Sequence, residues 1–228
     1  MHEVKLELGT DILEVNRREA EENRKHLEAH GIFAVDLLGA IGSGKTMLIE
    51  RVTPVLRDKG FRVGAIAGDV YGDDDFQRVV KLGIPAVNVN TGKECHLDAH
   101  LVHHALHELP LDEIDILFVE NVGNLICPTD FPLGSHLRVV VVSVTEGDDV
   151  IRKHPMIFRD SQICVINKVE LAQSVGVDVE KMVEDLKKVS PETILVKTSL
   201  KNGEGVEEFV EILLKFRDKL LSSRSEQH

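Results

Sequence analysis

The sequence is poor in the features that mark secreted and membrane proteins. Its 228 residues include three cysteines, which form no paired framework, and this favours a reducing compartment. It contains no run of about 18 apolar residues that could span a membrane. Its N-terminus, charged from Glu3 onward, contains no apolar signal segment. We therefore expect a cytoplasmic protein that has no membrane partner.

Positive charge is also scarce. Lys and Arg together number 27, against 39 Asp and Glu, which gives a formal net charge of −12 at pH 7. Such a surface would repel a phosphate backbone, so we expect no nucleic-acid partner. Apolar residues, by contrast, make up 43% of the chain, and at this length they are enough for one sizeable domain with a buried core.

Strand-like apolar segments alternate with helical ones through most of the chain, which is typical of a parallel α/β sheet. We predict strands at residues 32–38, 62–68, 86–90, 114–120, 137–144, 162–166 and 193–196. The clearest helices are predicted at residues 47–56, 97–108, 178–189 and 205–220. Residues 1–30 are predicted to form a charged helix that packs on the core or extends from it. The main domain then covers residues 31–221, with inserted metal-binding segments, and residues 222–228 are expected to fray.

The most informative motif is GAIGSGKT at residues 39–46, which lies between a predicted strand and a predicted helix. In this position the glycines let backbone N–H groups surround a polyphosphate, and the helix N-terminus adds a favourable dipole. Lys45 is expected to reach the β- and γ-phosphates, and Thr46 to bind the accompanying Mg²⁺. The motif therefore predicts a nucleoside-triphosphate site that contains Gly39, Ile41, Gly42, Ser43, Gly44, Lys45 and Thr46.

A second nucleotide signal, Asn167-Lys168-Val169-Glu170, directly follows the predicted strand at 162–166. Loops at the carboxyl ends of parallel strands commonly bind ligands. This loop is similar to the guanine-specificity motif Asn-Lys-x-Asp. The carboxylate of that motif accepts hydrogen bonds that guanine donates and adenine cannot. A later loop is placed to give a backbone N–H to guanine O6 through Ser199, Leu200 and Lys201. Together the two loops favour guanine over adenine.

Carboxylates at strand ends are the candidates for Mg²⁺ binding and hydrolysis. Asp69 and Glu120 each follow an apolar strand, where they can hold Mg²⁺ together with Thr46. Gly123 is expected to contact the γ-phosphate and to report its presence. One of Asp73, Asp74 and Asp75 is expected to orient the attacking water, and Asp75 is favoured. The predicted catalytic set is then Lys45, Thr46, Asp75 and Glu120. None of these residues is an arginine finger, so slow unassisted hydrolysis is expected.

The segment at residues 91–107 holds five of the chain's 11 histidines. Cys95 and His96 lie just before the predicted helix, and the spacing places His96, His100 and His104 on one helical face. Cys127 lies in a neighbouring loop of the nucleotide site. Thiolate and imidazole ligands suit Ni²⁺ or Zn²⁺, so we predict a metal site of Cys95, His96 and Cys127, with His100 and His104 as secondary ligands. The other helical histidines are interpreted as polar surface: His103 and His107.

Three ligands are one short of a closed tetrahedral metal site. A second chain with bridging thiolates, or a water molecule, would complete the coordination. An open or shared site suits a metal that is handed on. Since Cys127 closely follows Gly123, we expect the nucleotide state to be coupled to metal affinity.

Together these residues resemble the HypB family of GTPases, which assist nickel insertion into [NiFe]-hydrogenase precursors. The resemblance runs from about residue 30 and rests on residues 39–46, the Asp69 loop, Cys95-His96, residues 120–124, Cys127-Pro128 and Asn167-Lys168. It implies a P-loop NTPase fold of the SIMIBI type, with a mostly parallel sheet flanked by helices on both faces. It also implies GTP or GDP and Mg²⁺ as cofactors, and a homodimer in the GTP-bound form. Ni²⁺ or Zn²⁺ would be held at the dimer interface, and the implied partners are a HypA-like protein and the hydrogenase large-subunit precursor.

Two features differ from the family pattern. Glu170 replaces the usual Asp of the guanine-specificity motif. Residues 1–30 contain no cysteine and only three histidines, whereas some family members carry a nickel-binding motif there. No separate high-affinity or storage site is therefore expected, and the Cys95 site must carry the metal function.

Other functions remain open at this point. A urease accessory GTPase similar to UreG would have the same chemistry and a different client. A nickel or zinc storage protein would use the nucleotide fold as a scaffold only. A small-molecule kinase would need adenine preference, against which Asn167-Lys168 argues.

Overall fold

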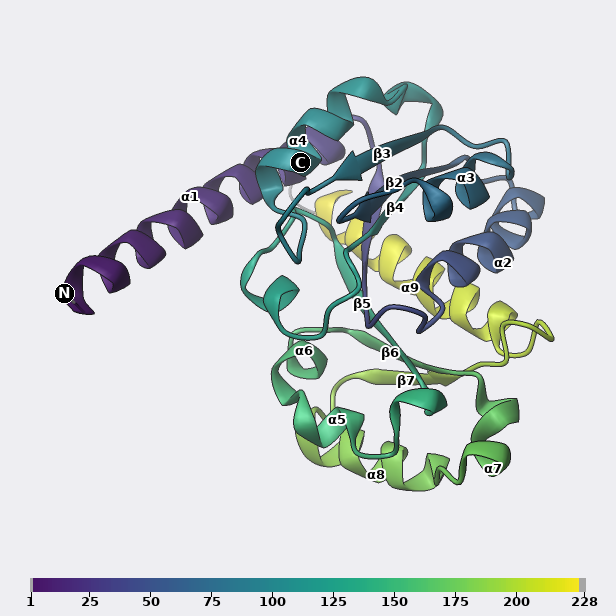
Figure 1. Cartoon of the computed structure of the whole chain (residues 1–228). Coiled ribbons are helices and arrows are strands. Elements are labelled where there is room, and N and C mark those ends of the chain that lie inside the picture. Colours follow the sequence, from purple (N-terminus) through teal and green to yellow (C-terminus); the bar gives the residue numbers. More distant parts are fainter. Residues whose placement is uncertain (1, 226–228) are drawn as a thin grey trace.

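The computed structural model describes residues 2–225, and the side chains of residues 12–222. Seven strands form one sheet in the order β3-β2-β4-β1-β5-β6-β7, and all of the pairings between them are parallel. The strands are β1 (Phe33–Leu38), β2 (Val63–Asp69), β3 (Ala86–Asn90), β4 (Ile116–Glu120), β5 (Leu137–Ser143), β6 (Ile163–Asn167) and β7 (Ile194–Lys197). Helices lie on both faces of this sheet (Figure 1), so the predicted α/β P-loop fold is confirmed.

The α-helices alternate with the strands along the chain. They are α1 (His2–Ala29), α2 (Lys45–Asp58), α3 (Asp74–Val80), α4 (Ala99–Glu108), α5 (Val150–Lys153), α6 (Pro155–Arg159), α7 (Ala172–Val175), α8 (Val179–Val189) and α9 (Val206–Ser225). Short 3₁₀ turns are η1 (Leu111–Glu113), η2 (Cys127–Asp130), η3 (Val144–Glu146) and η4 (Val169–Leu171). Within the described residues, no helix is both long and apolar enough to cross a membrane.

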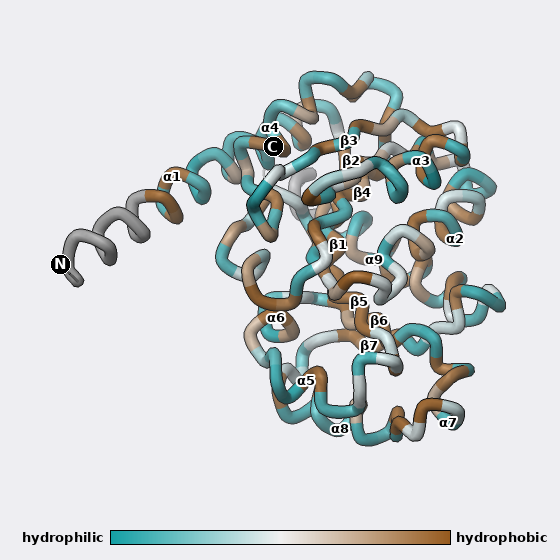
Figure 2. The backbone as a smooth tube through the Cα atoms, viewed as in Figure 1, coloured by the Kyte–Doolittle hydropathy of each residue, from teal (hydrophilic) through white to brown (hydrophobic). Residues whose placement is uncertain are grey.

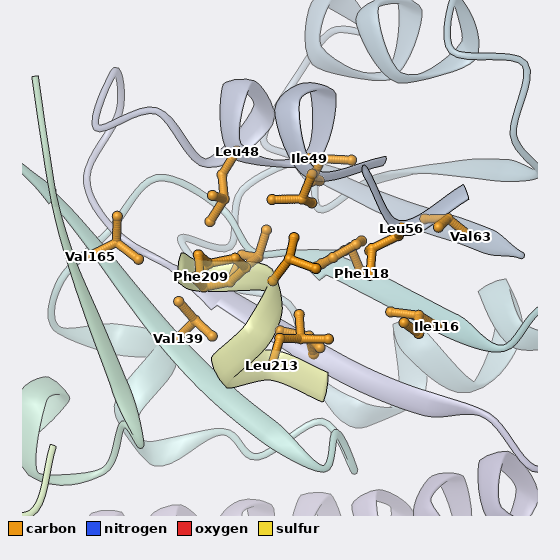
Figure 3. Packing of buried hydrophobic residues seen from close by; sticks show 14 of the residues in the cluster. Leu48, Ile49, Leu56, Val63, Ile116, Phe118, Val139, Val165, Phe209 and Leu213 are labelled. Carbon is orange, nitrogen blue, oxygen red and sulfur yellow. The ribbon is translucent and has the colours of Figure 1, made fainter. Parts of the chain in front are cut away.

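One face of the sheet is covered by α2 and α9. Ile49 of α2 and Phe209 of α9 pack in the same buried cluster as Phe118 of β4 (Figure 3). The other face is covered by α4 and the end of α1 over one half of the sheet, and by α5, α6 and α8 over the other half. The outer helix α8 is mostly hydrophilic (Figure 2), as expected of a helix with one face in solvent.

The apolar run in β5 shows why the central strands have no polar alternation. Val139 and Val141 point toward the α2 and α9 layer, whereas Val140 and Val142 point toward the α5, α6 and α8 layer. All four valines are fully buried. A parallel strand that is covered on both faces is therefore apolar at nearly every position.

The N-terminal helix α1 is anchored by its second half. Asn16 donates a hydrogen bond to the Pro132 carbonyl (2.9 Å), and its side-chain oxygen accepts one from the Ala99 backbone N–H (2.8 Å). The buried Asn23 donates to the carbonyls of Ala99 (2.7 Å) and Leu133 (3.2 Å). The first half of α1 projects beyond the rest of the molecule (Figure 1), so the helix both packs on the core and extends from it.

The structure corrects several element boundaries. The helix expected at residues 97–108 begins at Ala99, because Asp98 caps it by accepting a hydrogen bond from the Leu101 backbone N–H (2.8 Å). Residues 222–225, expected to fray, form the last turn of α9, and residues 226–228 lie outside the described chain. The short helices α5, α6 and α7 were not predicted, since four or five residues carry too little helical periodicity.

Candidate nucleotide and metal sites

The motif at residues 39–46 forms a loop between β1 and α2, at the carboxyl edge of the sheet. Its glycines have positive φ angles, 148° at Gly39, 76° at Gly42 and 113° at Gly44. A Cβ at Gly39 would lie 2.2 Å from the Val141 carbonyl oxygen, and one at Gly44 would lie 2.2 Å from the Asn167 side-chain nitrogen. The loop therefore requires glycine for its conformation and for its close packing.

Lys45, Thr46 and Glu120 meet at the start of α2. Lys45 Nζ donates hydrogen bonds to the carbonyls of Gly39 and Ala40, at 3.2 Å each. Thr46 Oγ1 donates to Glu120 Oε1 (2.8 Å), whereas the buried Glu120 Oε2 has no partner. Burial raises the pKa of Glu120 to about 7 and lowers the pKa of Lys45. An unpartnered carboxylate oxygen beside a hydroxyl is an oxygen donor set that fits Mg²⁺.

A cavity of about 300 Å³ lies over this loop. It brings together eleven of the predicted site residues, from five different segments: Ile41, Gly42, Gly44, Lys45, Thr46, Asp69, Asp75, Glu120, Gly123, Asn167 and Lys168. The cavity also includes Arg78, which the sequence analysis missed. Arg78 pairs with Glu50 (2.7 Å) and with Asp75 (3.2 Å). The spacing of three residues between Asp75 and Arg78 in a helix could have indicated this contact.

The loop after β6 connects the phosphate loop to the loop after β7. Asn167 Nδ2 donates to the Ser43 carbonyl (2.9 Å), and its Oδ1 accepts from Thr198 Oγ1 (3.1 Å) and the Leu200 backbone N–H (3.3 Å). Lys168 Nζ donates to the Gly42 carbonyl (2.7 Å). The other predicted nucleotide residues do not line the cavity: Gly39, Ser43, Glu170, Ser199, Leu200 and Lys201. Among these, the Glu170 side chain is exposed beside the cavity loop.

The segment after β4, residues 121–124, packs directly against the phosphate loop. A Cβ at Gly123 would lie 2.3 Å from Ile41 Cγ1 and 2.8 Å from the Ile41 backbone nitrogen. Asn124 forms an isolated antiparallel bridge with Gly39. A movement of residues 121–124 must therefore displace the phosphate loop, and the reverse also holds, because the two backbones are in direct contact.

Cys95, His96 and Cys127 come together near this segment. Their ligand atoms all lie within 4.8 Å of one another, and Cys95 Sγ is 3.8 Å from His96 Nδ1. A hydrogen bond with the Cys127 side chain, reinforced by burial, raises the pKa of Cys95. Burial also lowers the pKa of His96, which favours the neutral imidazole that binds metals. Two thiols and one imidazole at these separations suit Ni²⁺ or Zn²⁺.

The expected helical face of His96, His100 and His104 is wrong. Since α4 begins at Ala99, His96 lies in the loop before it, and its ring lies against that of Phe131, with the ring centres 3.9 Å apart and the planes tilted by 32°. His100 and His104 instead face each other on α4, with their Nε2 atoms 3.2 Å apart. The structure therefore separates the predicted secondary ligands from the Cys95 site.

Asn121, which the sequence analysis also missed, connects the two sites. Its Oδ1 accepts hydrogen bonds from the backbone N–H groups of Leu97 and Val122, both at 3.0 Å. Asn124 Nδ2 donates to the Cys95 carbonyl (3.4 Å). One short segment, residues 120–124, thus contacts both the phosphate loop and the Cys95-His96 loop.

Comparison with known proteins agrees with this geometry. The family model described as "CobW/HypB/UreG, nucleotide-binding domain" matches residues 33–197. A protein of Methanocaldococcus jannaschii described as "Probable hydrogenase maturation factor HypB" is 54% identical over 210 residues, which cover 92% of this chain and 95% of that protein. The chain belongs to the HypB family. The resemblance predicted from the motifs is therefore confirmed.

Two crystal structures of HypB proteins have the same fold. HypB from Archaeoglobus fulgidus matches with a TM-score of 0.83 and 50% identity, covering 89% of this chain and 98% of that chain. HypB from Helicobacter pylori, crystallised in complex with nickel, matches with a TM-score of 0.84 and 30% identity, covering 90% of this chain and 95% of that chain. The HypB fold thus extends over nearly the whole sequence.

Proposed function

We propose that this HypB-family chain is a GTPase whose nucleotide cycle controls a nickel site used in hydrogenase maturation. The observation that carries the proposal is the segment 120–124. Through Glu120 and Gly123 it contacts the phosphate loop, and through Asn121 and Asn124 it contacts the Cys95-His96 loop. A change at the γ-phosphate can therefore reach the metal ligands through two hydrogen bonds.

The nucleotide chemistry follows from the residues around the cavity. Lys45 exchanges its two carbonyl partners for the β- and γ-phosphates, and backbone N–H groups of the loop bind the remaining oxygens. Thr46, Asp69 and Glu120 would hold Mg²⁺, which when bound supplies positive charge to neutralise the phosphate oxygens. Asp75, held by Arg78, orients the attacking water.

Guanine selection is assigned to the two loops that Asn167 joins. Asn167 fixes the phosphate loop and the loop after β7 in one arrangement. The exposed carboxylate of Glu170 is then available to accept the N1–H and 2-amino protons of guanine. Ser199, Leu200 and Lys201 form the loop from which a backbone N–H is proposed to reach guanine O6.

The metal cargo is assigned to Cys95, His96 and Cys127. Three ligands from one chain leave a coordination position open, which a second chain or a water molecule fills. GTP binding is proposed to favour a homodimer that completes this site with Ni²⁺ or Zn²⁺. Hydrolysis then releases nickel to a HypA-like partner or to the hydrogenase large-subunit precursor.

The test is a titration of Ni²⁺ into the full chain, with mass measured by light scattering, once with GDP and once with a non-hydrolysable GTP analogue. We expect a dimer and altered nickel affinity or stoichiometry with the analogue. The Lys45→Ala variant, which should not respond to nucleotide, is the control. Equal mass and equal nickel binding in both nucleotides would contradict the coupling and favour a storage protein. If nucleotide and nickel binding are coupled but nickel is delivered to a urease apoprotein and not to a hydrogenase precursor, the urease accessory function would be favoured.

A further inference from the structure

A second group of histidines lies between α1 and α4, away from the Cys95 site. His26 of α1 lies beside His107 of α4, with ring centres 5.3 Å apart, and His107 lies beside His103 at 4.7 Å. Figure 1 shows α1 passing along α4 in this region. None of these three residues lines the nucleotide cavity.

A buried asparagine fixes the tautomer of His103. Asn23 is fully buried, and its Nδ2 donates to two backbone carbonyls, so its Oδ1 can only accept. His103 Nδ1 lies 3.1 Å from that oxygen and must therefore carry the proton. The Nε2 atom of His103 is then left with its lone pair, which is the state in which a histidine binds a metal.

The two Nε2 atoms of His103 and His107 are separated by a distance that one metal ion requires. They lie 3.1 Å apart. When two imidazole nitrogens each bind one ion at about 2.1 Å, the angle between them at the ion lies between the octahedral and the tetrahedral value. The two nitrogens are then about 3.0–3.4 Å apart. The positions i and i+4 on α4 hold the two rings at this separation without any change of backbone.

Open space lies beside two of these three rings. A cavity of about 350 Å³ is lined in part by His26, His30 and His107, and His103 is not part of its lining. His30 Nδ1 lies 2.8 Å from Asp112 Oδ1, so this carboxylate orients the His30 ring beside the cavity.

We propose that His103 and His107 form a second metal site that binds a divalent ion such as Ni²⁺ or Zn²⁺, and that the His26 ring, whose centre lies 5.3 Å from that of His107, turns toward the ion as the ligand from α1. Imidazole is a borderline ligand that suits these ions, and water completes the coordination. From the sequence alone, no separate site is expected, and His103 and His107 are interpreted as polar surface. The site would cross-link α1 to α4 and hold metal independently of the nucleotide.

The test uses the full chain with the Cys95 site removed by Cys95→Ala and Cys127→Ala. Ni²⁺ alone is titrated into this metal-stripped protein by calorimetry and by equilibrium dialysis. We expect one equivalent of tightly bound Ni²⁺ per chain. Adding His103→Ala and His107→Ala should abolish this binding, and His26→Ala should weaken the affinity about tenfold or more. The matched control is His100→Ala with His104→Ala, an i and i+4 pair on the same helix whose neighbour on α1 is Glu19, 3.4 Å from His100 Nδ1. This control should keep the tight equivalent.

Thermal unfolding provides a second measurement, because an ion that joins α1 to α4 stabilises the folded chain. Ni²⁺ should raise the Tm of the background protein and of the control, but not of the His103→Ala and His107→Ala variant. The proposal is overturned if the tight equivalent survives that double substitution. It is also overturned if the equivalent disappears in the control, or if His26→Ala leaves the affinity unchanged.

Discussion

Glu120 is the last residue of β4, and its two carboxylate oxygens differ in their hydrogen bonding. Oε1 accepts the Thr46 hydroxyl, while Oε2 is buried without a partner, and the pKa of the carboxyl rises to about 7. In the nucleotide-free protein the carboxyl is therefore about half protonated near neutral pH. A cation at this point would satisfy the second oxygen and restore the charged form.

The raised pKa makes stability depend on pH, and Glu120→Gln tests this. The folded state binds the proton more tightly than the unfolded state, so wild-type stability falls as pH rises from about 4.5 to about 7. Gln keeps the acceptor for Thr46 and removes the charge. We expect the nucleotide-free variant to be about 2–3 kcal/mol more stable than wild type at pH 8, and nearly equal to it at pH 4. Urea denaturation at the two pH values measures the difference.

The exposed Glu94→Gln is the matched control, for which no pH-dependent gain is expected. GTP hydrolysis by Glu120→Gln should fall, because an amide holds Mg²⁺ more weakly than a carboxylate does. Equal stability of the variant and the wild type at pH 8 would show that burial does not destabilise the ionised Glu120 carboxylate in the folded protein.

At the scale of elements, the attachment of α1 depends on a few buried amides. Asn16 donates to the Pro132 carbonyl and accepts from the Ala99 N–H, which belongs to the first turn of α4 and has no partner within that helix. Asn16→Ala should therefore lower the free energy of unfolding by about 2 kcal/mol, since it leaves a buried donor and a buried acceptor unpaired. Urea denaturation, with the exposed Glu14→Ala as the control, checks this. An equal loss in both variants would mean that the amide contacts contribute nothing specific.

The strands were predictable because parallel strands buried on both faces are continuously apolar, as Val139–Val142 are in β5. The first residue of a helix was less predictable where a capping side chain determines its position. Asp98 ends the preceding loop, and its capping bond moves His96 off the helix that periodicity alone predicts. That one bond decides whether His96 joins Cys95 or His100.

The nucleotide loop was predictable because the glycines, Lys45 and Thr46 are local in sequence. Asn121 and Arg78 were not, since their roles arise from contacts across the fold, with Leu97 and Glu50 respectively. The same holds for Asn23, whose contact with His103 joins residues 80 positions apart. Long-range hydrogen bonds leave no periodic signal in a sequence.

At the scale of the whole molecule, the nucleotide and metal sites should be separable by mutation. Cys95→Ala is expected to abolish metal binding at the Cys95 site and to leave the GTP affinity of the metal-free chain unchanged, because Cys95 does not line the nucleotide cavity. Lys45→Ala should lower GTP turnover roughly a hundredfold or more and leave metal binding by the nucleotide-free chain intact. Nucleotide titration and metal analysis of each variant test both statements. Loss of GTP binding in Cys95→Ala would assign that residue a structural role.

The projecting half of α1 has a consequence for how this protein moves through solution. At 1.5 Å per residue, a 28-residue helix is about 42 Å long, and much of it lies outside the rounded core (Figure 1). A rod attached to a sphere increases hydrodynamic drag more than it increases mass. The monomer should consequently elute early from a sizing column, as a heavier particle would, and sediment slowly, as a less compact particle does. Elution volume alone would then overstate its subunit number, whereas scattered light, which reports mass directly, would not.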